Sequence, residues 1–474
     1  MALNILLTVH QFFPEYFSGT EILTFGVAKE LIRRGHRVSV FTAFPARVSI
    51  PDSERFDEYK VDEIDVFRFR HSPVPMGDQT VVSELEYNNR LAARYFAALL
   101  LRTKPDVAHF FHLSRLGMGL VDAATAAAVP AYFTPTDFWS VCPTSQLMLP
   151  GGRVCRGPTR YAGNCVKHIA SLRLGTRGAK YVPDIVADAI VKLTLSGVLP
   201  NYPNSFEVAA VGRRKSFNLA RLNALHGIVS PTQLMTKVLT ANGVESQLIT
   251  QSGYGIDLAG YRSRVRNHRE AGVLTIGFIG TLSPHKGCHV LIDAIRHIGS
   301  DRVKLRIYGN PKDFPDYFDD LQRRAAGFDA IEFCGTFPNG RVTDVLDGLD
   351  ALVVPSLWYE NLPLVILSAL AAKCPVIVSN FPGMTEAVRD GWNGLVFAPG
   401  DVHGLSEKLT RLIDDPALLE LLSTNCARPH SIAEYVDDLL ALYANRHSAV
   451  AGREEIIPGR QTLIPLEPAS SQAV

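Results

Sequence analysis

The sequence predicts an α/β protein with two doubly wound, Rossmann-like domains that face each other across a cleft. The chain has 474 residues, which is too long for a single hydrophobic core. Short apolar runs alternate with helical patterns, as expected where helices cover both faces of a parallel sheet. This alternation forms two successive series, separated by an Arg-rich stretch at 261–269. The series predict domains at 1–265 and 270–430.

The first series begins with an apolar strand at 3–9 and a helix over 18–34. Ser18 and Glu21 have the spacing of a capping box, and Gly35 ends the helix. A strand at 37–43 completes a βαβ unit. Later strands are expected at 64–69, 106–111, 130–134, 227–229 and 247–251, with helices at 84–102 and from Pro231. The pattern loosens over about 142–225, which predicts an insertion.

The second series predicts strands near 274–280, 303–308, 330–334, 350–354, 375–379 and 394–397. A final helix at 431–446 is expected to pack back on the first domain. Residues 447–474 have little hydrophobic periodicity, and their composition is typical of a disordered tail.

Bulk composition narrows the function. A net charge of +1 argues against a nucleic-acid partner. Local basic clusters at 213–215 and 262–269 are most often solvated faces, although they are compatible with peripheral contact with a membrane surface. No apolar run is long enough to span a bilayer, the start lacks the features of a signal peptide, and seven cysteines fit a reducing compartment. These observations predict a cytoplasmic location, which includes the inner face of the cytoplasmic membrane.

The stretch ALVVPSLWYENLPLVILSAL at 351–370 is the centre of the second series. Its apolar strand ends at Pro355, and a helix is expected to begin with Asn361 as N-cap and Pro363 in the first turn. Unpaired N–H groups and the positive dipole end at such a helix start suit a diphosphate. Glu360 could accept hydrogen bonds from sugar hydroxyls. These residues alone fit an ordinary βα unit with a surface carboxylate equally well.

Four segments carry a family resemblance: FSGTEILTFGVAKELIRRGHRVSVFTA, IGFIGTLSPHKGCHVLIDAI, the stretch with WYEN, and FPGMTEAVRDGWNGLVFAPGD. Together they resemble the retaining, nucleotide-sugar-dependent glycosyltransferases of GT-B architecture, in the family 4 type marked by an E-x7-E segment. The resemblance covers most of 1–145 and 225–446, and it is more specific in the C-terminal half.

The resemblance implies roles for several residues. Lys286 would contact the donor diphosphate and Glu360 the donor sugar, and these two would be the catalytic residues. The amides of Asn361 and Leu362 would face the diphosphate. Two further roles are implied. Gly19 would be the loop glycine near donor and acceptor, and Glu386 would either shape the cleft or cap a helix.

The sequence departs from the family pattern at three positions around this site. Ser368 replaces the second Glu of E-x7-E, which would hold the nucleotide ribose. Thr136 stands where a histidine is usual, and Thr281 where an arginine often occurs. A serine is shorter and has a single hydroxyl, so the resemblance implies weaker nucleotide binding or another route to the ribose.

Chemistry of this type is expected to need no cofactor and no protein nucleophile, because the leaving diphosphate takes the acceptor proton. His112 and Asp137 are candidates to orient the acceptor; for His112, a packed structural histidine is an equal alternative.

A second constellation has the spacing C-x12-C-x9-C-x2-H, formed by Cys142, Cys155, Cys165 and His168. Four such ligands in one loop suit a closed tetrahedral zinc site that would hold the loop together. The alternative is three independent thiols and an unrelated histidine.

The resulting prediction is a glycosyltransferase that moves a hexose-type sugar from a nucleotide sugar to a glycan or lipid-linked acceptor with retention, in cell-envelope or exopolysaccharide synthesis. The alternative is a degenerate homologue that binds a sugar nucleotide or a partner enzyme without turnover. An epimerase or phosphorylase lacks support from any further acid–base pair or cofactor lysine. A dehydrogenase is disfavoured because no G-x-G-x-x-G follows the first strand.

Overall fold

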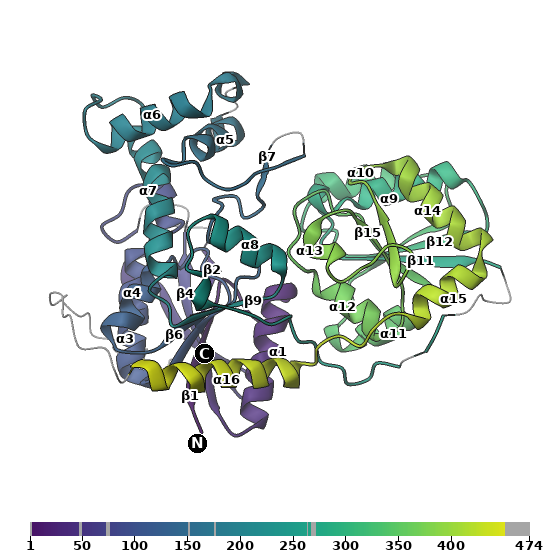
Figure 1. Cartoon of the computed structure of the whole chain (residues 1–474), viewed down its shortest axis with the longest axis horizontal. Coiled ribbons are helices and arrows are strands. Elements are labelled where there is room, and N and C mark those ends of the chain that lie inside the picture. The colour runs from purple at the N-terminus through teal and green to yellow at the C-terminus, as the bar shows by residue number, and fades with distance from the viewer. Residues whose placement is uncertain are drawn as a thin grey trace, which may run out of the picture.

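The computed structural model describes residues 2–46, 50–72, 76–149, 152–174, 177–262, 264–266 and 272–450. These residues form two α/β domains, each built around its own sheet, and a two-stranded hairpin in the insertion. Figure 1 shows the N-terminal domain in purple to teal and the C-terminal domain in green, with the last helix crossing back to the N-terminal domain.

The N-terminal sheet has eight strands in the order β10-β9-β6-β5-β1-β2-β4-β3. All neighbours pair in parallel except β3, which runs antiparallel to β4 at the edge. Its strands are β1 (Asn4–Val9), β2 (Arg37–Pro45), β3 (Phe56–Val61), β4 (Ile64–His71), β5 (Val107–Phe110), β6 (Ala131–Phe133), β9 (Gly227–Ser230) and β10 (Ile249–Gln251). Its helices are α1 (Gly19–Arg33), α2 (Val82–Leu85), α3 (Arg90–Thr103), α4 (Gly119–Ala126) and α8 (Gln233–Ala241).

The insertion lies between the neighbouring strands β6 and β9. It contains the hairpin β7 (Met148–Leu149) and β8 (Arg153–Val154), followed by α5 (Gly163–Leu174), α6 (Asp184–Leu195) and α7 (Ser205–Leu222). In Figure 1 α5 and α6 stand away from both sheets, above the N-terminal domain.

The C-terminal sheet has six parallel strands in the order β13-β12-β11-β14-β15-β16. The strands are β11 (Leu274–Ile279), β12 (Val303–Tyr308), β13 (Ile331–Gly335), β14 (Ala351–Val354), β15 (Val376–Ser379) and β16 (Gly394–Phe397). The helices are α9 (Cys288–Ile298), α10 (Pro315–Ala325), α11 (Val342–Asp347), α12 (Leu364–Ala371), α13 (Pro382–Thr385), α14 (Val402–Asp414) and α15 (Pro416–Thr424). β14 and β15 are buried along their whole length, which explains their uninterrupted apolar sequences.

The last helix, α16 (Ile432–Val450), packs against α1 of the N-terminal domain. Tyr435, Leu439 and Tyr443 are buried in the hydrophobic cluster that also contains residues of β1 and α1. Its attachment is also polar, because a guanidinium nitrogen of Arg34 donates to the carbonyl of Ala433 at 2.7 Å. The C-terminal segment therefore ties the chain back to its first helix.

Several expected boundaries differ from the structure. The helix predicted at 84–102 is two helices, α2 and α3, because the chain turns between them before Asn89 caps α3. The final helix continues to Val450, so residues 447–450 are helical and not part of a tail; residues 451–474 and Arg269 lie outside the described residues. The edge strand β3 and the hairpin β7–β8 were not predicted.

Candidate functional site

The C-terminal sheet reverses its strand order between β11 and β14, which are neighbours at its centre. From β11 the chain proceeds to β12 and β13 on one side, and from β14 to β15 and β16 on the other. In open parallel sheets, ligands bind outside the carboxyl ends of strands at such a switch point. Lys286 follows β11 and Glu360 follows β14, so the topology brings both residues to this point.

Lys286 and Glu360 are in direct contact. Nζ of Lys286 lies 2.6 Å from Oε1 of Glu360, and the hydroxyl of Ser356 donates to the same oxygen at 2.7 Å. The ammonium also lies 4.8 Å from the ring centroid of Trp358. Glu360 is only 5% exposed, and a buried carboxylate is tolerated only with partners of this kind. Sequence analysis missed Ser356 and Trp358, although Trp358 is the first residue of the WYEN segment and Ser356 lies two residues before it.

Two glycines allow the site loops to approach each other. Gly287 has φ +73°, and a Cβ there would lie 1.9 Å from the carbonyl oxygen of Pro355. A Cβ at Gly383 would lie 1.8 Å from the carbonyl oxygen of Asn361. Any larger residue at either position would push the loop after β14 out of place, so the contact between Lys286 and Glu360 depends on both glycines.

Asn361 does not cap the helix that follows it, so the predicted N-cap is wrong. The helix α12 begins at Leu364 with Pro363 at the N-cap position and no side-chain cap. The Asn361 side chain turns instead to the N-terminal domain, where its Oδ1 accepts from the Thr232 hydroxyl at 2.7 Å and its Nδ2 donates to Tyr254 Oη at 3.1 Å. The positive end of α12 is thus left without a side-chain acceptor beside the Lys286–Glu360 pair.

The remaining donor-side candidates occupy different environments. Leu362 is half-buried and packs against the hydrophobic cluster of the N-terminal domain. Ser368 is 9% exposed, and its side chain shares a hydrogen bond with Tyr261, whose pKa is raised chiefly by burial. Thr281 is half-buried just after β11, where its carbonyl accepts from the Ser283 amide at 2.9 Å.

The N-terminal sheet has an equivalent switch point between β1 and β5. Gly19 opens α1 after β1, and a Cβ there would lie 4.0 Å from Cγ of Leu364 at the start of α12. The hydroxyl of Thr20 donates to that of Thr136 at 2.9 Å. The N-terminal ends of α1 and α12 therefore face each other across the two domains.

His112 follows β5 at this switch point and is buried. Its Nδ1 accepts from the Ser114 amide at 3.2 Å, which leaves the proton on Nε2, 3.0 Å from Oδ2 of Asp137. Nε2 nevertheless lacks the alignment of a hydrogen bond. The two predicted acceptor-side residues are therefore adjacent.

Sequence analysis missed two further members of this cluster. The ring centroid of His10 is 4.2 Å from that of His112, and its Nε2 is 3.7 Å from Oε1 of Glu21. Burial holds the pKa of His10 well below its usual value and raises that of Glu21. His10 Nδ1 and Glu21 Oε1 are buried without hydrogen-bond partners. Their signal in the sequence was weak: His10 directly follows β1, and Glu21 was already explained as the capping-box residue of α1.

Glu386 caps a helix of the other domain. Its two carboxylate oxygens accept from the amides of Gln233 and Leu234, each at 2.7 Å, at the start of α8. Of the two alternatives for this residue, the structure therefore selects the helix cap. The helix concerned belongs to the N-terminal domain, so the contact also joins the two domains.

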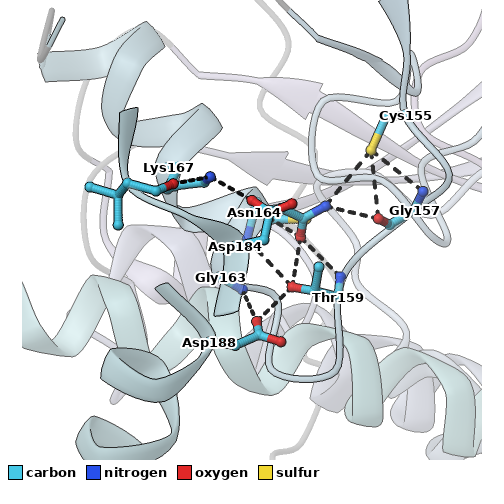
Figure 2. A network of polar contacts seen from close by, with 10 residues as sticks. Cys155, Gly157, Thr159, Gly163, Asn164, Lys167, Asp184 and Asp188 are labelled. Atoms are coloured by element: carbon cyan, nitrogen blue, oxygen red, sulfur yellow. Dashed lines mark hydrogen bonds and ion pairs between the residues drawn. The ribbon is translucent and has the colours of Figure 1, made fainter. Parts of the chain in front are cut away.

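The cysteine constellation forms one side-chain cluster. A small pocket in the insertion is lined by Cys142, Cys155, Cys165 and His168. Figure 2 shows the surroundings of Cys155, whose Sγ accepts from the Gly157 amide at 3.4 Å and lies 3.9 Å from Asn164 Nδ2. Burial and the neighbouring thiols raise the pKa of Cys165 to about 12.

These four residues are close together but not arranged around a common point. Among the described residues, no three His, Cys, Asp or Glu side chains are placed so that they could hold a metal ion. Hydrogen bonds organise the loop instead: the carboxylate of Asp188 accepts from the Thr159 hydroxyl at 2.6 Å and the Gly163 amide at 2.8 Å. Zinc binding therefore stays a prediction.

Two family models match the chain. The model described as Glycosyl transferase 4-like domain covers residues 18–172, and the model described as Glycosyl transferases group 1 covers residues 273–415. The first match begins at the capping box of α1, and the second includes β11, Lys286 and the loop that carries Glu360. The chain belongs to the glycosyltransferases. The glycosyltransferase family identified from the sequence is thereby confirmed, while retention of configuration stays a prediction.

Curated relatives of this glycosyltransferase align over only part of their length. It is 34% identical over 171 residues to glycogen synthase of Mycobacterium tuberculosis, and the aligned region covers 36% of this chain and 41% of the relative. It is 29% identical over 221 residues to D-inositol 3-phosphate glycosyltransferase of Actinosynnema mirum, and that aligned region covers 43% of this chain and 52% of the relative. The aligned part of this chain spans about half or less of each relative.

Solved structures resemble the glycosyltransferase over nearly its whole length. Anabaena Alr3699/HepE in complex with UDP and glucose has a TM-score of 0.59 at 14% identity, covering 95% of this chain and 100% of that one. Sucrose-phosphate synthase of Thermosynechococcus elongatus has a TM-score of 0.59 at 15% identity, covering 95% and 98%. These matches confirm the predicted class of two facing Rossmann-like domains.

No helix in the described part of the chain is long and apolar enough to cross a bilayer.

Proposed function

We propose that this glycosyltransferase moves a hexose-type sugar from a nucleotide-sugar donor to a hydroxyl of a glycan or lipid-linked acceptor, with retention of configuration. We place this reaction in the cytoplasm, in cell-envelope or exopolysaccharide synthesis. The observation that carries the proposal is the 2.6 Å contact between Lys286 and Glu360 at the switch point of the C-terminal sheet. The neighbouring solved structure of Alr3699/HepE, which contains UDP and glucose, supports a nucleotide sugar as donor.

The proposed reaction depends on stabilising the leaving group. The bond between the sugar anomeric carbon and the donor diphosphate breaks while the acceptor oxygen bonds to the same face of that carbon. The acceptor proton moves to the departing diphosphate. Lys286 and the free amides at the start of α12 would stabilise the charge that develops there, and Glu360 would accept hydrogen bonds from the sugar. No cofactor and no protein nucleophile takes part in this scheme.

The acceptor would enter from the N-terminal domain. His112 and Asp137 lie at the carboxyl edge of that sheet, and the buried atoms of His10 and Glu21 without partners are suited to bind hydroxyl groups. Exclusion of water would protect the reacting sugar from hydrolysis.

Substitution of Lys286 tests the proposal. Purified protein is assayed for transfer to acceptor and for slow donor hydrolysis over a panel of UDP, GDP and ADP sugars. Lys286→Ala should lower kcat by roughly 10²–10³-fold, the usual effect of removing one preorganised cationic or donor group from a site of developing charge.

Lys304→Ala is the matched control, because Lys304 is an exposed lysine on β12. Wild-type activity in Lys286→Ala would contradict the proposed role of the lysine. Binding of a sugar nucleotide by the wild type, without turnover of any donor in the panel, would favour the second candidate function.

That second candidate is a degenerate homologue that binds a sugar nucleotide or a partner enzyme. It is supported by the departures at Thr136, Thr281 and Ser368, and by the hydrogen bond that already occupies the Ser368 side chain. Lys286, Glu360 and the uncapped start of α12 together favour the active enzyme, because they are the groups that would stabilise the leaving diphosphate.

A further inference from the structure

The insertion at 142–225 has a charge unlike that of the rest of the chain. It contains twelve Lys and Arg residues against three Asp and Glu, whereas the whole chain contains 48 against 47. Arg153, Arg156, Arg160, Lys192 and Arg213 are exposed. The basic excess of the protein is therefore concentrated in this one segment, and the remainder is acidic.

The same segment also carries most of the exposed large apolar side chains. Among the described residues, 14 large hydrophobic side chains are exposed, and nine of them lie in the insertion: Val154, Leu172, Tyr181, Ile185, Val186, Ile190, Leu193, Val198 and Phe206. Tyr181 is 77% and Ile185 80% exposed. Scattered apolar residues need no explanation on a protein surface, but a concentration of this kind marks an interaction site.

The helix α6 shows how this surface is built. Its buried residues are Ala187 and Val191, which lie one turn apart and form a narrow stripe against α5 and α7. Ile185, Ile190 and Leu193 are exposed on the rest of the helix. A helix that is apolar over most of its circumference is stable only when a second apolar surface covers it.

The position of the insertion connects it with the acceptor side. It leaves the carboxyl end of β6 shortly after Thr136 and Asp137, and it returns to the sheet at β9. Figure 1 shows α5 and α6 standing beyond the ends of the strands, away from the sheet. A flat partner could therefore reach α6 without meeting the two sheets.

We propose that the insertion docks this glycosyltransferase on an anionic lipid surface, with the apolar residues of α6 at the level of the headgroups. The basic residues provide electrostatic attraction to anionic lipids, and the apolar helical face provides the hydrophobic burial that holds a protein at such an interface. A second copy of the chain is less suited, because a two-fold interface would bring two strongly basic insertions together. This proposal identifies the place where a lipid-linked acceptor would meet the enzyme, and in that respect it rests on the proposed function.

Vesicle flotation tests the docking without donor or acceptor. The full chain is mixed with vesicles of phosphatidylcholine alone or with added phosphatidylglycerol. The wild type should float with the anionic vesicles only, and added salt should reduce the bound fraction because it screens the basic charges. The double variant Ile185→Glu/Ile190→Glu should lower the partition coefficient by roughly tenfold or more, since it removes apolar contact and adds negative charge.

The matched control is Phe314→Glu/Leu421→Glu, which changes two exposed apolar residues of the C-terminal domain. It should bind vesicles as the wild type does, and all variants should keep the wild-type melting temperature because the changed residues are exposed. Equal flotation of wild type and the α6 variant would overturn the proposal, as would equal binding to neutral vesicles. If the wild type does not float but forms a dimer, and the α6 variant is a monomer, the surface belongs to an interface with a second copy. Loss of transferase activity would leave this readout unchanged, so the two proposals can fail separately.

Discussion

At the scale of single residues, Lys286 and Glu360 are each other's partners, and under the proposed function a donor would displace this contact. The ammonium is held by a carboxylate at 2.6 Å and by the face of Trp358. An arriving diphosphate offers a stronger anion to the lysine, and sugar hydroxyls offer donors to the released carboxylate. Under the proposed function the pair is a preformed site in which each partner keeps the other oriented until the donor enters.

Ser368 allows a gain-of-binding prediction. Ser368→Glu restores the carboxylate that related enzymes would use for the ribose, and it should tighten binding of the preferred nucleoside diphosphate by roughly tenfold through charge-assisted hydrogen bonds. Isothermal titration measures this effect. Ser368→Gln is the control with the same length and no charge, and its affinity should change little.

The hydroxyl of Tyr261 shares a hydrogen bond with Ser368 and would have to move for the new carboxylate. Weaker binding in Ser368→Glu, together with weaker binding in Tyr261→Phe, would contradict the prediction and assign the ribose contact to Tyr261.

The family resemblance placed Lys286 and Glu360 at one site, and the structure brings them together because neighbouring parallel strands end at a common edge, so the loops after β11 and β14 meet. It did not predict the partners of Asn361. Thr232 and Tyr254 are more than 100 positions away in the chain, and an asparagine two residues before a proline has the local pattern of an N-cap. Long-range partners of this kind leave no periodic signal in the sequence.

At the scale of elements, α16 depends on a buried histidine in the N-terminal sheet. His109 on β5 interacts through Nδ1 with Tyr443 Oη at 2.7 Å and through Nε2 with the Thr134 hydroxyl at 2.9 Å. Burial lowers the pKa of His109 to about 3. The imidazole is therefore neutral in the folded protein and links the sheet to the last helix.

This burial predicts a loss of stability in acid. Between the ordinary pKa of histidine, about 6.5, and a folded value of about 3, the unfolded chain binds a proton that the folded chain excludes. Stability therefore falls as the pH is lowered from neutral, by up to about 1.4 kcal/mol per pH unit for this one group. His71, whose pKa is about 4 because of burial, adds to the same trend over a narrower range.

His109→Gln separates this contribution from others. At pH 7 the variant should be less stable by roughly 1–3 kcal/mol because its buried hydrogen bonds are imperfect, yet its stability should fall less steeply between pH 6.5 and 4. Thermal melts across this range provide the measurement. The exposed His297→Gln serves as control and should follow the wild-type curve; a parallel curve for His109→Gln would contradict the prediction.

Regular elements of the core were predictable for a physical reason: strands buried on both faces must be apolar throughout, as in β14 and β15. Elements with weak signals were not. β3 is a half-exposed edge strand rich in charged residues, and its position is set by pairing with β4. The break between α2 and α3 likewise depends on the Asn89 cap, whose side chain accepts from Ala92 N.

At the scale of the whole molecule, the two domains meet through specific polar and aromatic contacts. Glu386 binds the first amides of α8, Asn361 binds Thr232 and Tyr254, and the ring of Tyr359 stacks on Phe138 at a centroid distance of 5.5 Å. Tyr359 and Asn361 belong to the loop after β14, and Glu386 follows α13, whose Gly383 packs against that loop. The geometry of these contacts was beyond sequence analysis because it depends on how two separately folded domains are placed.

Glu386→Gln tests the strength of this interface. The change removes the charge that favours the helix N-terminus and weakens one of the two acceptors, which should lower the local free energy of opening by about 1 kcal/mol. The amides of Gln233 and Leu234 should then exchange with solvent roughly fivefold faster in hydrogen-exchange experiments.

Glu407→Gln is the matched control, since Glu407 is an exposed carboxylate on α14 that pairs with His403 of the same helix. Exchange at the start of α8 should be unaffected there. Unchanged exchange in Glu386→Gln would show that the apolar contacts alone keep the domains together.

The order of residues in the loop after β14 has a thermodynamic consequence. Glu360 pairs with Lys286, and Asn361, its immediate neighbour, binds Thr232 of the opposite domain. A ligand that shifts Glu360 also acts on Asn361, so under the proposed function nucleotide binding and the spacing of the two domains share a single coupling free energy. Such coupling is reciprocal. If the nucleotide changes the affinity for a partner that holds the two domains at one spacing, that partner must change the affinity for the nucleotide by the same factor.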